Sequence, residues 1–373
     1  MRHLVQVVAL YNPPHVGGME MRARDRAERL TKRDWTVETL TSSEKTYPHV
    51  VEDNNLTVRY LKSKEIARTP IIFSLPFSLM KIPKDSIVQV ETAIAFCPEI
   101  TAFICKLRGI SYIARVPLDS TGHSKLRDKL LSYYQKSALR WVYKHAARII
   151  VLTEDDVVHI SEKYHVDPKK FRIIPNATDF VPVKAPRKDF HKPFRLLFEG
   201  RIAGQKNVPL LLESLRYFLD TYALPVHLNI VGDGEGMPTV RDKIKELSLQ
   251  KYVSLNGFVT GRKVEEYFED ADAFVMSSTH ESFPQTLLEA MAKGLPMITS
   301  NILGVRTVVK DGKSGILVDL AKESFANAFH RLIVEKKLYQ KLANGSFEEA
   351  KKYSWDATID AYLDLYTELQ PVK

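Results

Sequence analysis

The chain has 373 residues, of which 45% are hydrophobic and 27% are charged. At roughly 150 residues per domain, this length predicts about two domains, and the apolar content is sufficient for two cores. The composition excludes a disordered chain, a collagen-like fibre and a disulfide-rich scaffold. The two cysteines, Cys97 and Cys105, are too few for a zinc-ligand pattern and fit a reducing compartment.

The formal net charge is +9, and it is unevenly distributed. Residues 1–190 hold 31 Lys and Arg against 21 Asp and Glu, whereas residues 191–373 hold 23 against 24. The basic first half predicts either contact with an anionic partner, such as nucleic acid or an acidic membrane surface, or a solvated basic face with no partner.

The predicted elements of the first half alternate between strand and helix, which is typical of a doubly wound α/β domain. A helix is expected at 19–33, after a loop at 11–18. Strands are expected at 4–10, 36–41, 87–90, 111–116, 148–152 and 172–174.

A proline-rich, basic stretch at 182–193 predicts an interdomain linker, after which the pattern restarts. Strands are expected at 194–198, 226–231, 252–255, 273–277 and 296–299, and helices at 208–220, 240–247, 263–268, 284–293 and 355–369. The fold class is therefore α/β, with two Rossmann-like doubly wound domains that face a central cleft. The expected boundaries are 1–183 for the first domain, 184–192 for the linker, 193–354 for the second domain and 355–373 for the C-terminal helix.

The strongest motif is a pair of glutamates eight residues apart, Glu281 and Glu289, with Pro284 between them. Proline at the first turn of a helix costs no hydrogen bond, and the unpaired N–H groups of that turn form an anion site. Glu289 would lie about 8 Å into the helix, roughly the step from a diphosphate to a ribose. The alternative is an amphipathic core helix with two solvated glutamates. The N–H groups concerned are those of Gln285, Thr286 and Leu287.

Three further motifs follow predicted strands. Arg201 and Lys206 follow the strand at 194–198, where open α/β sheets bind ligands, and both suit phosphate oxygens. Gly17 and Gly18 precede the first helix, where backbone can approach a ligand closely. The glycines of 232–236 have the wrong spacing for a dinucleotide fingerprint and predict a turn near the nucleotide pocket. Each motif is also explained by an ordinary turn or a basic loop facing water.

Together these motifs resemble the retaining GT-B glycosyltransferases of family four, and the resemblance covers nearly the whole chain in the same motif order. It implies that Arg201 and Lys206 bind the donor diphosphate, that Glu281 contacts the transferred sugar, and that Glu289 binds the ribose. It also implies that the C-terminal helix packs back on the first domain. The implied donor-binding residues are Gly17, Gly18, Arg201, Lys206, Val259, Glu281, Phe283, Pro284, Gln285, Thr286 and Glu289, and the implied catalytic residues are Glu281, Arg201, Lys206 and His123.

The sequence departs from the family pattern in two places. Ala177 and Thr178 replace the usual Gly-Val after Pro-Asn, and Pro117 stands where many members carry a histidine. His123 is the candidate acceptor-side residue, with His15 a weaker one, although each also fits a surface loop.

The expected reaction is transfer of a sugar from a UDP- or GDP-linked donor to a hydroxyl of a lipid-linked saccharide or polysaccharide precursor. Fixed cations and a helix dipole can stabilise the leaving diphosphate, so we expect no metal and no other cofactor. The resemblance implies retention of the anomeric configuration. The alternatives are a nucleotide-sugar epimerase or a phosphorylase on the same fold, or a basic nucleic-acid-binding protein, for which no known module is present.

No secretory signal or membrane-spanning stretch is visible, so a cytoplasmic protein is expected. Residues 125–148 carry seven Lys and Arg against one Asp among several aromatics, which predicts peripheral contact with the inner face of an anionic membrane. The apolar stretch at 69–83 has basic flanks and also fits lipid contact. The alternative is that these aromatic residues belong to the core. The aromatic residues of the basic stretch are Tyr133, Tyr134, Trp141 and Tyr143.

Overall fold

A computed structural model describes residues 2–11, 18–43, 49–66, 69–116, 135–281 and 283–370. The chain divides by internal contacts into two compact units. Unit 1 comprises residues 1–175 and 358–373, and unit 2 comprises residues 176–357. The boundary lies at 175/176, earlier than the expected position at 183, because the residues after it pack on unit 2.

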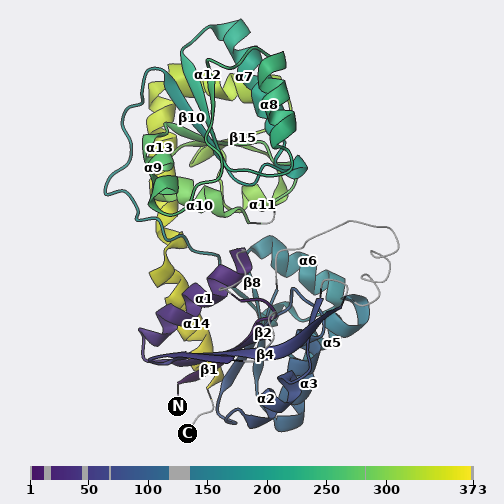
Figure 1. Cartoon of the computed structure of the whole chain (residues 1–373). Helices are drawn as coiled ribbons and strands as arrows, with labels where there is room; N and C mark the ends of the chain where they lie inside the picture. Colours follow the sequence, from purple (N-terminus) through teal and green to yellow (C-terminus); the bar gives the residue numbers. More distant parts are fainter. Residues whose placement is uncertain are drawn as a thin grey trace. The chain divides into compact units, whose positions relative to one another are not determined.

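Unit 1 is built around one mainly parallel sheet (Figure 1). Its nine described strands follow the order β3-β4-β2-β1-β6-β7-β8-β9, with β5 paired to β4. The elements are β1 (His3–Val7), α1 (Gly18–Thr31), β2 (Thr36–Ser43), β3 (His49–Asp53), β4 (Leu56–Ile66), β5 (Thr69–Ile72), α2 (Leu75–Lys81), β6 (Ile87–Glu91), α3 (Cys97–Arg108), β7 (Tyr112–Arg115), a π-helical turn (Gln135–Leu139), α5 (Arg140–His145), β8 (Arg148–Val151), α6 (Glu154–Tyr164) and β9 (Phe171–Ile173).

The parallel strands of unit 1 give the strand order of a doubly wound fold. The order reverses between β1 and β6, because β2 and β4 extend the sheet on one side and β7 to β9 on the other. The strands β3 and β5 pair with β4 in the antiparallel sense and were not expected from the sequence. Strand β3 is exposed along its whole length, so no buried alternation marks it, and β5 is a four-residue segment at the start of the apolar stretch at 69–83.

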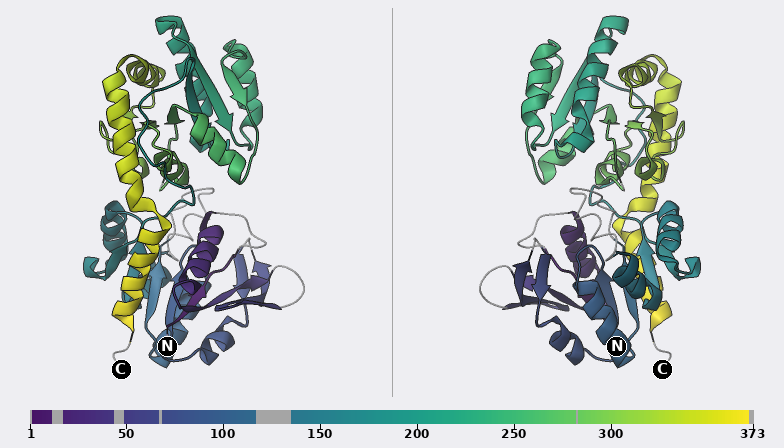
Figure 2. Two further views of the ribbon diagram at one scale, coloured as in Figure 1. Left: turned by 90° about the vertical axis from the view of Figure 1, so that its left-hand side faces the viewer. Right: turned by 90° about the vertical axis from the view of Figure 1, so that its right-hand side faces the viewer.

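The C-terminal helix α14 (Trp355–Leu369) returns to unit 1, as the views of Figure 2 show. Tyr366 packs 5.2 Å from Trp35, centroid to centroid, and donates a 2.7 Å hydrogen bond to Gln89 on β6. Glu368 forms ion pairs with Arg148 and Arg172. The last helix is therefore part of the unit that the first strand begins.

Unit 2 contains a six-stranded, all-parallel sheet with the order β12-β11-β10-β13-β14-β15 among its described residues. In chain order this is a 3-2-1-4-5-6 sheet, which reverses between β10 and β13. The elements are β10 (Phe194–Glu199), α7 (Val208–Tyr222), β11 (Val226–Val231), α8 (Met237–Glu246), β12 (Val253–Leu255), α9 (Arg262–Asp270), β13 (Ala273–Met276), α10 (Gln285–Ala292), β14 (Met297–Ser300), α11 (Leu303–Arg306), β15 (Gly315–Val318), α12 (Lys322–Val334) and α13 (Lys336–Ala350).

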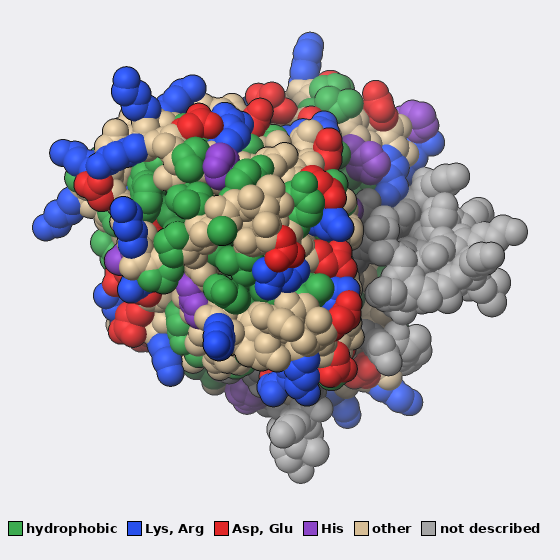
Figure 3. Space-filling view, turned by 90° about the horizontal axis from the view of Figure 1, so that it is seen from above, with side chains coloured by type: hydrophobic (Ala, Val, Ile, Leu, Met, Phe, Trp, Pro, Cys, Tyr) green, Lys and Arg blue, Asp and Glu red, His purple; other side chains and the backbone are tan. Residues whose placement is uncertain are grey.

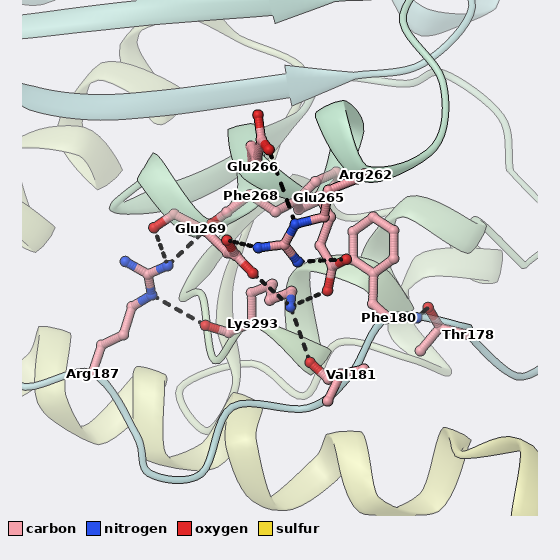
Figure 4. A network of polar contacts seen from close by, with 10 residues as sticks. All are labelled: Thr178, Phe180, Val181, Arg187, Arg262, Glu265, Glu266, Phe268, Glu269 and Lys293. Atoms are coloured by element: carbon pink, nitrogen blue, oxygen red, sulfur yellow. Dashed lines mark hydrogen bonds and ion pairs between the residues drawn. The ribbon is translucent and has the colours of Figure 1, made fainter.

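The residues expected to form a linker are held on unit 2 (Figure 4). Arg187 donates hydrogen bonds to the carbonyl oxygens of Lys293 at 3.1 Å and Glu269 at 2.8 Å. The buried Asp272 accepts from the backbone N–H of His191 at 3.1 Å and of Arg195 at 2.8 Å. These contacts fix an extended segment that has no secondary structure of its own. No described helix is both long and apolar enough to span a bilayer.

Candidate functional site

The candidate site of unit 2 lies where the strand order reverses. The loops after β10 and β13 leave neighbouring strands at the carboxyl edge of the sheet, which is where open α/β folds bind ligands. The loop after β10 carries Arg201 and Lys206, and the loop after β13 carries Glu281. The topology therefore brings together two motifs that are 75 residues apart in sequence.

Lys206 and Glu281 form a direct ion pair with an Nζ–Oε1 distance of 2.6 Å. The same oxygen accepts a 2.7 Å hydrogen bond from the Ser278 hydroxyl. The side chains of Lys206 and Glu281 are 13% and 10% exposed, so the pair is largely shielded yet accessible. The neighbouring Ser277 hydroxyl donates to the carbonyl oxygens of Lys206 and Asn207 at 2.9 Å, and these hydrogen bonds fix the backbone of the lysine.

Two glycine loops cross closely beneath Arg201. Gly232 has a φ of 131°, and a Cβ at this position would lie 2.0 Å from the carbonyl oxygen of Gly200. The loops are joined by hydrogen bonds from Gly200 N to Val231 O at 3.1 Å and from Gly232 N to Gly257 O at 2.8 Å. The glycines at 232–236 therefore lie in a turn, which the sequence predicted, and this turn packs against the Arg201 loop, which it did not.

Arg201 itself is solvent-exposed and pairs with Glu235 at 3.0 Å. Its guanidinium is 73% exposed, so the pair contributes little to stability and is free to exchange for another anion. Glu235 was not expected from the sequence as a partner of the site. Glu235 belongs to the glycine turn, and its sequence position does not reveal that this turn lies against Arg201.

Glu199, the last residue of β10, is an acidic group that the sequence motif did not single out. Burial raises the pKa of its carboxyl to about 7, and the positive charge of Lys206 offsets this effect only in part. Near neutral pH this carboxyl is therefore partly protonated. Two carboxylates, Glu199 and Glu281, thus share the neighbourhood of a single ammonium group.

The helix α10 starts one residue later than expected. Pro284 caps it with an extended ψ of 122°, so the helix begins at Gln285. The expectation that the Leu287 N–H is unpaired is wrong, because it donates to Pro284 O at 3.3 Å in a tightened first turn. The Thr286 hydroxyl is buried and makes no hydrogen bond within the described part of the chain. Because buried hydroxyls are nearly always paired, this group is a candidate ligand donor.

The other residues of the glutamate motif pack on unit 2 itself. Phe283 is buried, with its ring 6.0 Å from that of Tyr353. Gln285 donates a 2.9 Å hydrogen bond to the carbonyl oxygen of Ala177. Glu289 lies on α10 and is half-buried, and Val259 is half-buried after β12. These positions leave the donor-binding roles of Glu289 and Val259 as predictions.

Lys293, directly after α10, is a buried residue whose role the sequence did not reveal (Figure 4). Its ammonium group forms ion pairs with Glu265 and with Glu269, the latter at 3.1 Å. It also donates a 3.0 Å hydrogen bond to Val181 O. Lys293 therefore ties the end of α10 to α9 and to the segment that enters unit 2.

Some of the predicted residues lie outside the part of the chain that the structure describes. Gly17, His15, Pro117 and His123 lie outside the described residues, and Gly18 is described only as the first residue of α1. Asp270 ends α9 and Asp272 precedes β13, where its carboxylate accepts hydrogen bonds from backbone N–H groups.

The basic stretch at 125–148 is described only from residue 135. Within it, Tyr143 is a core residue whose hydroxyl lies 2.8 Å from that of Thr92, and Trp141 packs against the same core. For Tyr143 the core interpretation is correct, because the side chain is buried, whereas Trp141 is only partly buried against this core.

Two family models match the chain, one in each half. The model described as "Glycosyltransferase Family 4" matches residues 16–180, and "Glycosyl transferases group 1" matches residues 183–349. A galactosyltransferase of Escherichia coli, named for UDP-Gal and GlcNAc-diphosphoundecaprenol, is 31% identical over 62% of this chain. A D-inositol 3-phosphate glycosyltransferase of Geodermatophilus obscurus is 29% identical over 69%. The matches span 64% and 63% of these two curated relatives, so the chain covers less than two thirds of either.

Solved structures share the fold over the whole chain. HepE of Anabaena, solved with UDP, has a TM-score of 0.76 at 14% identity and covers 99% of this chain and 100% of its own. Sucrose-phosphate synthase of Thermosynechococcus elongatus has a TM-score of 0.71 at 19% identity and covers 99% of each chain. Together with the two sheets, these matches identify the GT-B fold with its two Rossmann-like domains. The chain belongs to the GT-B glycosyltransferases of family four.

Proposed function

We propose that the protein transfers a sugar from a UDP- or GDP-linked donor to a hydroxyl acceptor, with retention of the anomeric configuration and without a metal ion. The observation that carries this proposal is the Lys206–Glu281 ion pair at the reversal point of the unit 2 sheet, 2.6 Å long and partly accessible. It joins a cation suited to a diphosphate with a carboxylate suited to sugar hydroxyls.

In this proposal the site stabilises charge on the leaving diphosphate. Lys206 and Arg201 supply positive charge, and the first turn of α10 supplies backbone N–H groups and the buried Thr286 hydroxyl. Partial protonation of Glu199 near neutral pH removes negative charge that would otherwise repel the donor. Fixed groups of this kind provide the electrostatic role that a metal ion plays elsewhere.

We expect Glu281 to hold the transferred sugar and Glu289 the ribose, with backbone near Val259 next to the base. A donor phosphate oxygen would help to deprotonate the acceptor on the same face of the sugar, with His123 as the candidate acceptor-side residue. The relative from Escherichia coli is named for a diphosphoundecaprenol-linked acceptor, and this supports a lipid-linked saccharide as the acceptor class. Such an acceptor is consistent with a cytoplasmic enzyme that attaches peripherally to the membrane.

The first test is a thermal-shift screen of the full chain with UDP- and GDP-sugars, with and without EDTA. We expect one nucleotide class to raise the melting temperature equally in both conditions. The anomer of the product, determined by NMR with an added saccharide acceptor, should be that of the donor. An EDTA-sensitive shift or an inverted product would contradict the metal-independent or the retaining part of the proposal.

A hydroxyl deletion tests the donor site directly. Thr286→Val should weaken donor binding about tenfold to a hundredfold, because a buried hydrogen bond to a charged group contributes roughly 1.5–3 kcal/mol. Thr286→Ser should retain binding, and the exposed Thr260→Val should behave as the native chain. Equal affinities for all three variants would remove Thr286 from the donor site.

A further inference from the structure

The helices α2 and α3 pack side by side on one face of the unit 1 sheet (Figure 1). Their inner residues, which include Leu79 and Ala102, join the same core cluster. At one end the Arg108 guanidinium donates a 2.7 Å hydrogen bond to the Leu79 carbonyl oxygen, which joins the two helices. Their outward faces therefore form one surface.

That surface is apolar where a solvated helix pair would be polar. Five large apolar side chains on it are between 48% and 70% exposed, and we name them the α2–α3 patch: Phe73, Phe77, Met80, Phe103 and Leu107. Phe77 and Met80 are three residues apart on α2, and Phe103 and Leu107 are four apart on α3, so each pair lies on one helix face, whereas Phe73 lies in the turn before α2. Single exposed apolar residues need no explanation, but a cluster on adjoining helices marks an interaction site.

Basic side chains border the patch. Lys81 and Lys84 follow Met80, Lys106 precedes Leu107, and all three are exposed. Within the described ranges Lys81 and Lys84 form no ion pair, whereas the Lys106 ammonium lies 3.0 Å from His145 Nε2 and over the Trp141 ring. Of the carboxylates of this stretch, Asp85 is exposed and Glu99 is half-buried, and both interact with other groups. The free charge beside the patch is therefore positive.

A hollow adjoins the patch on the side of α2. This cavity of about 400 Å³ is lined by Lys81 and Ser78 from α2 and by Arg59, His49 and Glu38 from the strands, among others. Arg59 pairs with Glu38, so Lys81 adds an uncompensated charge to the lining. A concave, cationic site next to an apolar surface fits a phosphate headgroup whose acyl chains lie beside it.

The face of unit 2 that carries α7, α8 and α12 is an example of an ordinary solvated surface, for comparison with the α2–α3 patch (Figure 3). There, basic and acidic side chains are interspersed among apolar ones, as on a solvated surface. A second copy of this chain is a poor occupant of the α2–α3 patch. A two-fold contact would place Lys81, Lys84 and Lys106 opposite the same three lysines.

We propose that the α2–α3 patch docks on an anionic phospholipid bilayer, with its apolar side chains in the interface and Lys81, Lys84 and Lys106 on lipid phosphates. This places the membrane contact on residues 73–107 rather than on the basic stretch at 125–148. The inference rests on the proposed function only in that a lipid-linked acceptor would lie in the same membrane.

The test is flotation of the full chain with vesicles of phosphatidylcholine alone or with 30% phosphatidylglycerol, at 0.05 and 0.5 M NaCl. We expect binding to the anionic vesicles that weakens at least fivefold at high salt. Phe77→Ser/Leu107→Asn should reduce the partition coefficient at least tenfold, and Lys81→Glu/Lys84→Glu should do so at low salt.

Matched controls separate the patch from general effects. Val158→Asn removes an exposed apolar residue of α6, and Lys32→Glu/Lys169→Glu makes the same change in net charge elsewhere on unit 1. Both controls should bind as the native chain does. Equal loss in patch and control variants, absence of binding by the native chain, or a dimer that Phe77→Ser/Leu107→Asn converts to monomer would overturn the proposal.

The experiment also separates this inference from the proposed function. The patch variants should retain the donor-induced thermal shift, because their changes lie in unit 1 and the donor site is built in unit 2. Vesicle binding without any nucleotide-sugar shift would contradict the proposed function and leave the docking surface standing. A nucleotide-sugar shift without vesicle binding would contradict the docking surface and leave the proposed function standing.

Discussion

Each unit contains a buried ionic cluster at the reversal point of its sheet, and the two clusters differ in composition. In unit 1, Glu91 at the end of β6 lies between two arginines, Arg26 and Arg115, at 3.0 Å from each. Arg26 also donates to Gln6 Oε1 at 2.7 Å and to the Tyr362 hydroxyl on α14 at 3.4 Å. All three charged side chains are almost fully buried.

In unit 2 the ratio is inverted, because one ammonium group, Lys206, serves two carboxyls, Glu281 and Glu199. Burial would raise the pKa of Glu91, but its two arginines outweigh this effect and hold the pKa below the usual value. The pKa of Glu199 is instead raised to about 7. The unit 1 cluster is structural, because its groups pair with one another and are covered by α14. The unit 2 cluster has one shared cation and an accessible edge, so one of its carboxyls can be replaced by a ligand.

The largest expected effect comes from breaking the unit 1 cluster. Glu91→Ala leaves two buried guanidinium groups without their carboxylate and should lower the free energy of unfolding by about 3–5 kcal/mol. Urea unfolding monitored by circular dichroism and tryptophan fluorescence measures this change. The exposed Glu52→Ala provides the control and should change stability by less than about 0.5 kcal/mol. A loss below 1 kcal/mol for Glu91→Ala would show that the cluster does not support unit 1.

Breaking the unit 2 pair should instead affect catalysis. Lys206→Ala should lower kcat at least a hundredfold, because a cation that meets charge developing in the transition state is lost. Its melting temperature should fall less than that of Glu91→Ala, since the Lys206–Glu281 pair is more accessible than the almost fully buried cluster of unit 1. Lys245→Ala on α8 is the control for the loss of one charge. A Lys206→Ala variant whose melting temperature falls strongly, but whose kcat below that temperature is unchanged, would contradict the distinction between the two clusters.

Glu199 gives a prediction for pH dependence. Because its folded pKa of about 7 lies above the unfolded value of 4.5, the native state prefers the protonated form. Stability should therefore fall as pH rises from 4.5 to 7, by up to about 3 kcal/mol for this group, and then level off. In the native protein we expect the donor KM to rise above pH 7, because the ionised Glu199 then repels the donor. Glu199→Gln should abolish both this rise and the part of the pH-dependent stability that Glu199 causes. Parallel pH profiles for native and Glu199→Gln proteins would refute the shifted pKa.

The smallest effect is expected at the exposed pair. Glu235→Gln frees Arg201 for the donor and should lower the donor KM twofold to threefold, with no measurable loss of stability, because the pair is solvent-exposed. Asp242→Asn on α8 makes the same charge change away from the site and should leave KM unaltered. A raised KM for Glu235→Gln would mean that Glu235 positions Arg201 rather than competing for it.

The sequence predicted the elements that carry a clear pattern. The strand β8 contains a run of buried β-branched residues at 149–151, and the helix after Pro284 begins within one residue of its predicted start. The strand β3 could not be predicted in this way, because its five residues are all exposed and it is stabilised by pairing to β4. The helices at 322–350 and the strand β15 were also not predicted.

The sequence pointed to some residues of the candidate site, but not to Glu199 or Glu235 and not to the pairings between residues. Lys206 and Glu281 were each recognised from local motifs, yet their ion pair depends on β10 and β13 being neighbours. The same holds for Arg187 and Lys293, whose partners lie on other elements of unit 2. Spacing in the sequence describes what one loop offers, whereas the order of strands in the sheet decides which loops meet.

The return of α14 to unit 1 has a consequence for biosynthesis. A ribosome completes Pro175 long before it reaches Thr358, and unit 1 needs both for its final packing. At about 5–20 residues per second, roughly 10–40 seconds separate the two events. During that interval the surface around Trp35 and Gln89, which Tyr366 later covers, is exposed while unit 2 is translated. The nascent first domain is therefore a natural client for chaperones that bind apolar surfaces during translation.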